Sequence, residues 1–148
     1  MKEWAIRLPS QFQDKEFHSI VRICSNCRTK PSSAALCLVC GAVVCMNSTC
    51  CRKTTVGECN LHAMRCSPNA CPFFSIATSH VLIVVGSRGG YWFDPVYLNA
   101  YGEADFGLKK GHELFLSKPR MKRLWKMWLL HQFPQDLFAR EVRPSHRF

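Results

Sequence analysis

Hydrophobic positions in the first segment of the chain, residues 1–23, recur at helical spacing. Phe12, Phe17 and Ile20 fall near one face of a helix, which is the pattern of an amphipathic element. Ser10 can cap that helix, since a glutamine stands three positions later in a capping-box pattern. We therefore expect a lead-in helix that begins next to Ser10.

The period of the pattern changes from helix to strand in residues 72–116. Two β-rich runs, FFSIA and HVLIVV, are followed by a turn at glycines 89 and 90 and by a third run, YWF. Runs of β-branched and aromatic residues between turn signals predict an antiparallel meander, with HVLIVV as its buried central strand. Pro95 ends the third run, because proline has no N–H to donate to a ladder.

Residues 117–133 carry the clearest helical pattern. Ser117 is a candidate N-cap, Pro119 suits the first turn, and Pro134 stops the helix. One apolar stripe is expected, made of Met121, Leu124, Trp125, Trp128 and Leu129. The tail, residues 134–148, lacks such a pattern, and we expect it to be frayed.

Residues 24–71 contain all ten cysteines of the chain. Glycine, asparagine and proline punctuate this part, so loops and short strands are expected rather than long helices. The segment has too few large apolar side chains to build a core of its own. It therefore needs covalent or metal cross-links.

The kind of cross-link depends on the redox compartment. The first twenty residues carry charges throughout, and no apolar run reaches the ~20 residues of a membrane span. We expect a cytoplasmic protein, with the nucleus as an alternative, and no membrane partner. Paired cysteines do not persist as disulfides in these reducing compartments, so metal ligation is favoured. A disulfide-bonded extracellular domain remains an alternative hypothesis.

The spacing of the cysteines is typical of zinc sites. Cys37 and Cys40 form a C-x2-C pair followed by Gly41, a pattern in which both thiolates of a tight turn reach one ion. Cys59 and His62 have the same reach. The candidate metal ligands are Cys24, Cys27, Cys37, Cys40, Cys45, Cys50, Cys51, Cys59, His62 and Cys66.

Two zinc ions are predicted from the number of ligands. With Cys71 there are eleven ligand positions, whereas two tetrahedral sites use eight and three would need twelve. A plausible division places Cys37, Cys40, Cys59 and His62 on one ion, and interleaved divisions are equally compatible. We interpret Cys71 as a small buried thiol beside the aromatic residues that follow it.

The predicted fold is one α+β domain over residues 1–148. It is a small zinc-stapled domain with cysteine-rich loops, an antiparallel β meander and flanking helices. A nucleophilic cysteine would need an accessible, electropositive site and a base. His62 is better explained as a ligand, so no catalytic residue is assigned. Of the other histidines, only His80 is kept as a reserve ligand.

The net charge is +10, and ten of the twenty Lys and Arg residues lie in 109–148. Such a basic end suits nucleic acid, an acidic protein or an anionic membrane, or is a solvated helix face. A basic zinc-finger protein that binds nucleic acid is therefore an alternative function. Trp125 and Trp128 argue against it, because they fall on the apolar stripe and are expected to be buried rather than offered to bases.

A glycine-rich stretch, YGEADFGLKKG, joins the β pattern to the last helix. Glu103 and Asp105 could serve there as an acid/base pair or a cation site. We favour a structural interpretation, in which they cap a turn and pair with Lys109 or Lys110.

Taken in order, these motifs resemble the C-terminal domain of UBR-family RING-type E3 ubiquitin ligases, the N-recognins of the N-degron pathway. The resemblance runs from about residue 8 to about residue 131, and it rests on CLVCG, the later G-x-C-x-x-H-x-x-x-C and Y-G-E-x-D-x-G-L-K-K-G. It covers Cys37, Cys40, Cys45, Cys50, Cys51, Cys59, His62 and Cys66, which are enough for two zinc ions. Cys24 and Cys27 look like an addition. The chain departs from the family pattern at SPNACP, where glycines are expected, and at Asn99, where an acidic residue is expected.

The resemblance implies a zinc-binding module or fragment of such a ligase, which supports ubiquitin transfer from E2 to substrate lysines and ubiquitin-dependent degradation. The implied partners are the other domains of the ligase, through which E2 and N-degron substrates are engaged. We recognise no UBR box here, and no RING, because a RING places a histidine just after its third cysteine. The chain is therefore expected not to be catalytic alone.

Overall fold

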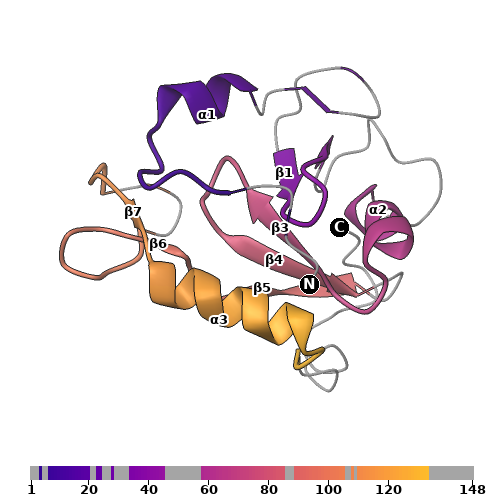
Figure 1. The fold of residues 1–148 in the computed structure, drawn as a ribbon. Helices are drawn as coiled ribbons and strands as arrows, with labels where there is room; N and C mark the ends of the chain where they lie inside the picture. Colours follow the sequence, from indigo (N-terminus) through magenta and orange to yellow (C-terminus); the bar gives the residue numbers. More distant parts are fainter. Residues whose placement is uncertain are drawn as a thin grey trace.

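The computed structural model is built on an antiparallel β-sheet with helices around it (Figure 1). It describes residues 4, 7–20, 23–24, 28, 34–45, 58–85, 89–105, 108 and 110–133. The elements are, in order, α1 (Lys15–Ile20), β1 (Ala34–Cys37), β2 (Val43–Cys45), α2 (Glu58–Cys66), β3 (Cys71–Ser75), β4 (Val81–Val85), β5 (Gly89–Phe93), β6 (Tyr97–Leu98), β7 (Phe115–Leu116) and α3 (Lys118–Leu129). The predicted α+β class is confirmed.

The main sheet has the strand order β2-β1-β3-β4-β5, and each neighbouring pair is antiparallel. The predicted meander is confirmed in β3, β4 and β5, and every residue of β4 is buried. Strands β1 and β2 come from the cysteine-rich part, where short strands were expected. Because β1 pairs with β3, the cysteine-rich part and the meander share one sheet.

The strands divide the core into two clusters, because successive side chains of a strand point to opposite faces. In β4, Val81 and Ile83 join the larger cluster, which also contains buried residues of α3 and of the N-terminal segment. Leu82 and Val84 join the smaller cluster with residues of α2. Cys37 belongs to the smaller cluster. The alternation of β1 therefore turns this cysteine toward α2.

Helix α3 starts as predicted and ends earlier. Ser117 caps it, with its Oγ accepting the N–H of Arg120 at 3.4 Å. Trp128 is buried, as predicted, whereas Trp125 is only half-buried. The helix ends at Leu129, four residues before the predicted end, and the tail 134–148 lies outside the described residues. No helix in the described part of the chain is long and apolar enough to cross a membrane.

The predicted start of the lead-in helix is wrong. The helix that forms, α1, is capped by Asp14, whose carboxylate accepts an N–H of the first turn at 3.0 Å. Ser10 lies in a bend outside it. The side chain of Gln13 donates to the carbonyl of His112 at 3.1 Å and accepts the N–H of Leu114 at 3.2 Å. The side chain of Gln13 is therefore bound in a long-range contact and does not form the capping box with Ser10.

The loop between β6 and β7 confirms the structural interpretation of its carboxylates. Asp105 is buried and accepts the backbone N–H of Lys110 at 3.0 Å, and Glu103 pairs with the Lys110 ammonium at 3.3 Å. Asn99, where the resemblance led us to expect an acid, accepts the backbone N–H groups of Tyr101 and Glu103 at 2.9 and 3.0 Å. An amide oxygen thus closes the turn without a negative charge.

Gly90→Ala tests the close approach of β5 to β4. A Cβ at this position would lie 2.5 Å from the carbonyl oxygen of Ile83, so the backbones must move apart. We expect the free energy of unfolding to fall by about 3 kcal/mol, the upper end of overpacking costs, as measured by urea denaturation. Gly102→Ala is the matched control, because its Cβ meets nothing within 4 Å and its φ of +77° costs only about 1 kcal/mol. An equal loss in both variants would contradict this register.

Candidate metal centre

Helix α2 brings two candidate ligands to one face. His62 and Cys66 are four residues apart, so they lie one turn apart on the same side of the helix. A helix of nine residues was not expected in the cysteine-rich part. The spacing of Cys59, His62 and Cys66, at three and then four residues, is the signal in the sequence that could have found it.

The turn after β1 brings the other two candidates. The N–H of Gly41 donates to the carbonyl of Cys37 at 2.8 Å, which closes a tight turn. Gly41 has a φ of +84°, a left-handed conformation that suits glycine. The turn places Cys40 next to Cys37, as the knuckle pattern predicts.

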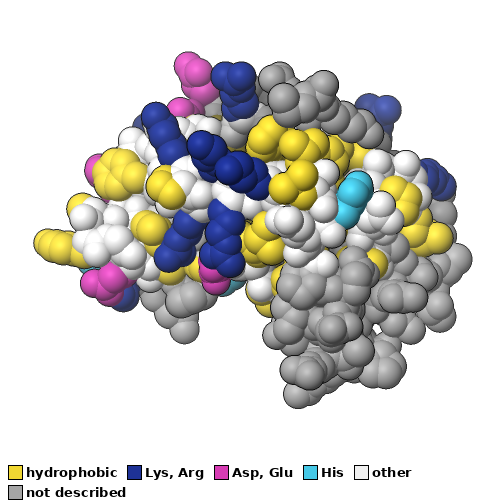
Figure 2. All heavy atoms as spheres, turned by 60° about the horizontal axis from the view of Figure 1, so that its bottom comes forward, with side chains coloured by type: hydrophobic (Ala, Val, Ile, Leu, Met, Phe, Trp, Pro, Cys, Tyr) yellow, Lys and Arg dark blue, Asp and Glu magenta, His cyan; other side chains and the backbone are white. Residues whose placement is uncertain are grey.

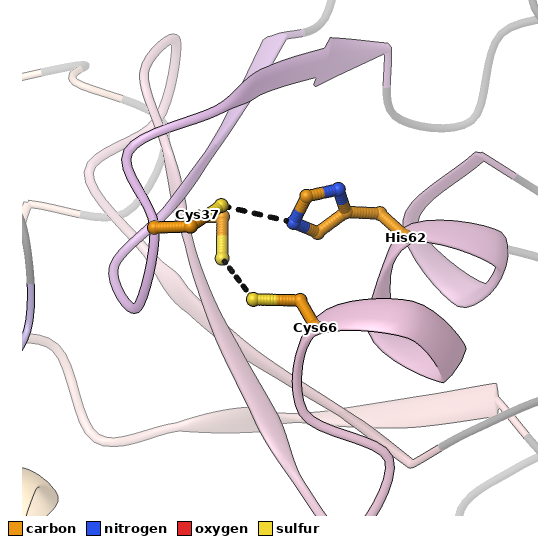
Figure 3. Close-up of side chains that lie close together, drawn as sticks. Cys37, His62 and Cys66 are labelled. Atoms are coloured by element: carbon orange, nitrogen blue, oxygen red, sulfur yellow. Dashed lines mark hydrogen bonds between the residues drawn. The ribbon is translucent and has the colours of Figure 1, made fainter. Parts of the chain in front are cut away.

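These two elements face each other, so that Cys37 from β1 and His62 and Cys66 from α2 point toward a common space (Figure 3). The ligand atoms of Cys37, Cys40, His62 and Cys66 all lie within 4.8 Å of one another. Cys40 Sγ is 3.2 Å from His62 Nε2, and the Sγ atoms of Cys37 and Cys66 are 3.9 Å apart. A zinc tetrahedron with ligands about 2.0–2.3 Å from the ion has edges of roughly 3.3–3.8 Å. The group could therefore hold one metal ion.

The donor set and its electrostatics also suit a metal. A hydrogen bond with Cys71 lowers the pKa of the Cys37 thiol well below its usual range, although burial opposes this. Burial raises the pKa of Cys66 to about 12 and also raises that of Cys40. The thiols cannot all ionise so close together unless a positive charge joins them. Three thiolates and one imidazole around a divalent ion meet that need, and this set is typical of structural zinc.

Cys71 lies beside this group without belonging to it. It is fully buried on β3, and its Sγ is 3.6 Å from that of Cys37. The hydrogen bond with Cys37 and burial both raise the pKa of Cys71, so this thiol keeps its proton. The interpretation of Cys71 as a small buried thiol agrees with its position, and the structure adds its contact with a candidate ligand.

The sequence suggested Cys59 as the fourth ligand beside Cys37, Cys40 and His62. In the structure the fourth member of this group is Cys66. Cys59 and Cys66 are seven residues apart on α2, or about 10 Å along the helix axis, so one ion cannot reach both. Cys59 is fully buried at the other end of the helix, where its Sγ is 3.8 Å from the carbonyl oxygen of Cys45. Cys24 and Cys45 form a small buried cluster of their own.

The remaining candidates lie elsewhere. Cys27, Cys50 and Cys51 fall outside the described residues. His80, the reserve ligand, stacks edge-on against Trp92 at 5.7 Å and is not in the metal-binding group.

Comparison with known proteins places residues 5–130 in one family. These residues match the family model described as Proteolysis_6 C-terminal, and the match includes all four members of the group. The chain is 36% identical over 139 residues to E3 ubiquitin-protein ligase ubr1 of Schizosaccharomyces pombe (strain 972 / ATCC 24843), with 93% of this chain covered. It is 35% identical over 128 residues to E3 ubiquitin-protein ligase UBR3 of Homo sapiens, and 36% identical over 135 residues to ubr3 of Danio rerio, covering 86% and 88% of this chain. The chain spans about 7% of the length of each of these relatives.

A pair of cysteine variants tests the metal group. Cys66→Ala removes one of the four facing ligand atoms, and we expect the purified chain to lose one equivalent of bound zinc, as measured by elemental analysis. Cys71→Ala removes a neighbouring thiol and should leave the zinc content unchanged. Loss of zinc in Cys71→Ala together with retention in Cys66→Ala would contradict the assignment.

Proposed function

Because this chain belongs to the Proteolysis_6 C-terminal family, we propose that it is a zinc-binding C-terminal module of a UBR-type E3 ubiquitin ligase of the N-degron pathway. The observation that carries the proposal is the Cys37, Cys40, His62 and Cys66 group, which lies within the family-matched residues. In this role the module supports ubiquitin transfer from E2 to substrate lysines, and so the degradation of substrates, without catalysing the transfer itself.

Zinc in this module is a cross-link rather than a reagent. The group joins α2, which supplies His62 and Cys66, to the end of β1, which supplies Cys37, and to the turn after it, which supplies Cys40. A bound ion supplies the positive charge that lets buried thiolates lie together. With all positions filled by protein atoms, as in closed structural sites, it leaves none for a substrate or water. We therefore propose a structural ion.

A second zinc ion is part of the proposal. Cys24, Cys45 and Cys59 supply buried thiols at the far end of α2, which is too distant to share the first ion. Cys27, Cys50 and Cys51, outside the described residues, are the candidates that complete this second site. The two proposed zinc sites therefore lie at opposite ends of α2, one with Cys59 and the other with Cys66.

The proposed partners follow from the size of the relatives. We take residues 1–148 as one domain, since the main sheet joins the cysteine-rich part to the meander. The ligase domains around it would bind E2 and N-degron substrates, and this module would hold their arrangement. The proposed location is the cytoplasm, with the nucleus as an alternative.

Metal removal should unfold the module. We expect two zinc equivalents per chain, and a chelator should abolish the cooperative thermal transition, because α2 is too short to persist without its ligands. Circular dichroism with and without chelator measures this, and zinc addition should restore the transition. A metal-free chain that unfolds at the same temperature would contradict a structural role.

The proposed role in the ligase can be tested by domain exchange. This chain replaces the matching segment of the Schizosaccharomyces pombe ligase, and the half-life of a reporter with a destabilising N-terminal residue is measured. We expect the exchanged ligase to degrade the reporter and its Cys66→Ala variant to fail, while the matched variant Met64→Ala, exposed on the same helix, stays active. A long-lived reporter in cells that contain the folded, zinc-loaded exchange ligase would contradict the proposal.

A further inference from the structure

A groove lies on the α3 side of the sheet, away from the metal centre. It has a volume of about 580 Å³, within the usual range of ligand pockets. Its apolar walls come from Met121 and Trp125, one turn apart on α3, and from Leu116 of β7. The N-terminal segment forms the opposite wall with Trp4 and Leu8.

Two hydrogen bonds hold the walls of the groove together. The Tyr97 hydroxyl donates to the carbonyl of Pro9 at 2.6 Å, and the N–H of Leu116 donates to the carbonyl of Ser10 at 2.8 Å. These bonds tie the N-terminal segment to β6 and β7. The groove is therefore formed before any ligand arrives, which lowers the entropic cost of binding.

The rim of the groove is positively charged. Arg7 and Lys122 are exposed on it, and among the described residues that line the groove none carries a carboxylate. On this face Lys and Arg side chains gather next to hydrophobic ones (Figure 2). Lys122 also borders a second hollow of about 400 Å³, together with Arg123 and Lys126. Helix α3 carries five basic residues and no acidic residue.

From these features we propose that the groove binds an acidic peptide segment of another protein. Large apolar side chains of that segment fill the space between Trp125 and Trp4, and its carboxylates face Arg7, Lys122 and Lys126. Apolar anchors in a preformed groove supply the affinity, and the surrounding charges select the partner.

Other occupants fit this surface less well. A second copy of the chain brings the same positive charge, since the net charge is +10. Nucleic acid supplies negative charge but no apolar side chain to fill the hollow, and Trp125 is half-buried in the wall rather than free to stack on a base. The proposal does not depend on the ligase assignment, because it rests on the groove alone.

A binding experiment with the zinc-loaded chain tests this surface. The probe is a fluorescein-labelled peptide of Glu residues with interspersed Leu anchors, and fluorescence anisotropy reports its binding. We expect saturable binding to this peptide. Two control peptides, one with every Leu replaced by Ala and one with every Glu replaced by Lys, should each bind at least about tenfold more weakly, because each lacks one of the two attractions.

Matched variants then locate the site. Lys122→Glu should raise the dissociation constant of the Leu/Glu peptide by about tenfold. Arg65→Glu, the same charge change on α2, should change this constant by less than about twofold. Met121→Ala should also weaken binding of this peptide. Met64→Ala, which changes an exposed methionine on α2, should leave the binding unchanged. Unfolding midpoints of all variants confirm that they are folded.

Several results would overturn the proposal. These are the absence of saturable binding, equal binding of the Ala-substituted peptide, or equal effects of Lys122→Glu and Arg65→Glu. Tighter binding of a poly(U) RNA of the same charge would assign the basic face to nucleic acid instead. Self-association that Met121→Ala abolishes, seen in sedimentation velocity, would assign the groove to a second copy of the chain.

Discussion

The approach of α2 to the turn after β1 is the contact on which the rest of the fold depends. The cluster beneath α2 is the smaller of the two, and many of its members are small residues such as Ala35, Val44 and Ala63. The cluster on the opposite face of the sheet is larger and contains more aromatic rings. Small side chains bury little area, so hydrophobic contact alone holds α2 weakly. The four facing side chains of Cys37, Cys40, His62 and Cys66 could hold one metal ion, and such an ion would supply the cross-link that this small contact area lacks.

The sequence predicts the parts of the fold in which local pattern and tertiary environment agree. The run that forms β4 is buried on both faces, and a continuous apolar sequence is the pattern expected of such a strand. Ser117 caps α3 as its local pattern predicts, with its hydroxyl oxygen accepting the N–H of Arg120. The lead-in helix forms as α1, but its predicted start at Ser10 is wrong for the opposite reason. Gln13 is bound to backbone groups about a hundred positions away, a contact that a local pattern does not contain.

The candidate site shows a similar limit. The spacing of cysteines and histidine predicted the types of candidate ligand, and the turn at Gly41 followed from its C-x2-C-G pattern. The partition among ions did not follow, because it depends on which ends of α2 meet which strands. A helix carries Cys59 and Cys66 on one face but about 10 Å apart. The antiparallel pairing of β1 with β2 places Cys37 and Cys45 at opposite ends of the hairpin. This pairing determines which end of α2 lies near Cys37 and which lies near Cys45.

The metal centre and the basic groove lie on opposite faces of the sheet, yet they are joined at its edge. Ser67 follows Cys66 directly, and its hydroxyl accepts the indole N–H of Trp128 at 3.0 Å. The ring of Trp128 packs edge-on against Trp4, a wall of the groove, with centroids 5.5 Å apart. Each step in this chain is a direct contact, so the end of α2 is connected to a residue that lines the groove. The residue that follows the candidate metal group on one face of the sheet therefore supports, through Trp128, a wall of the groove on the other face.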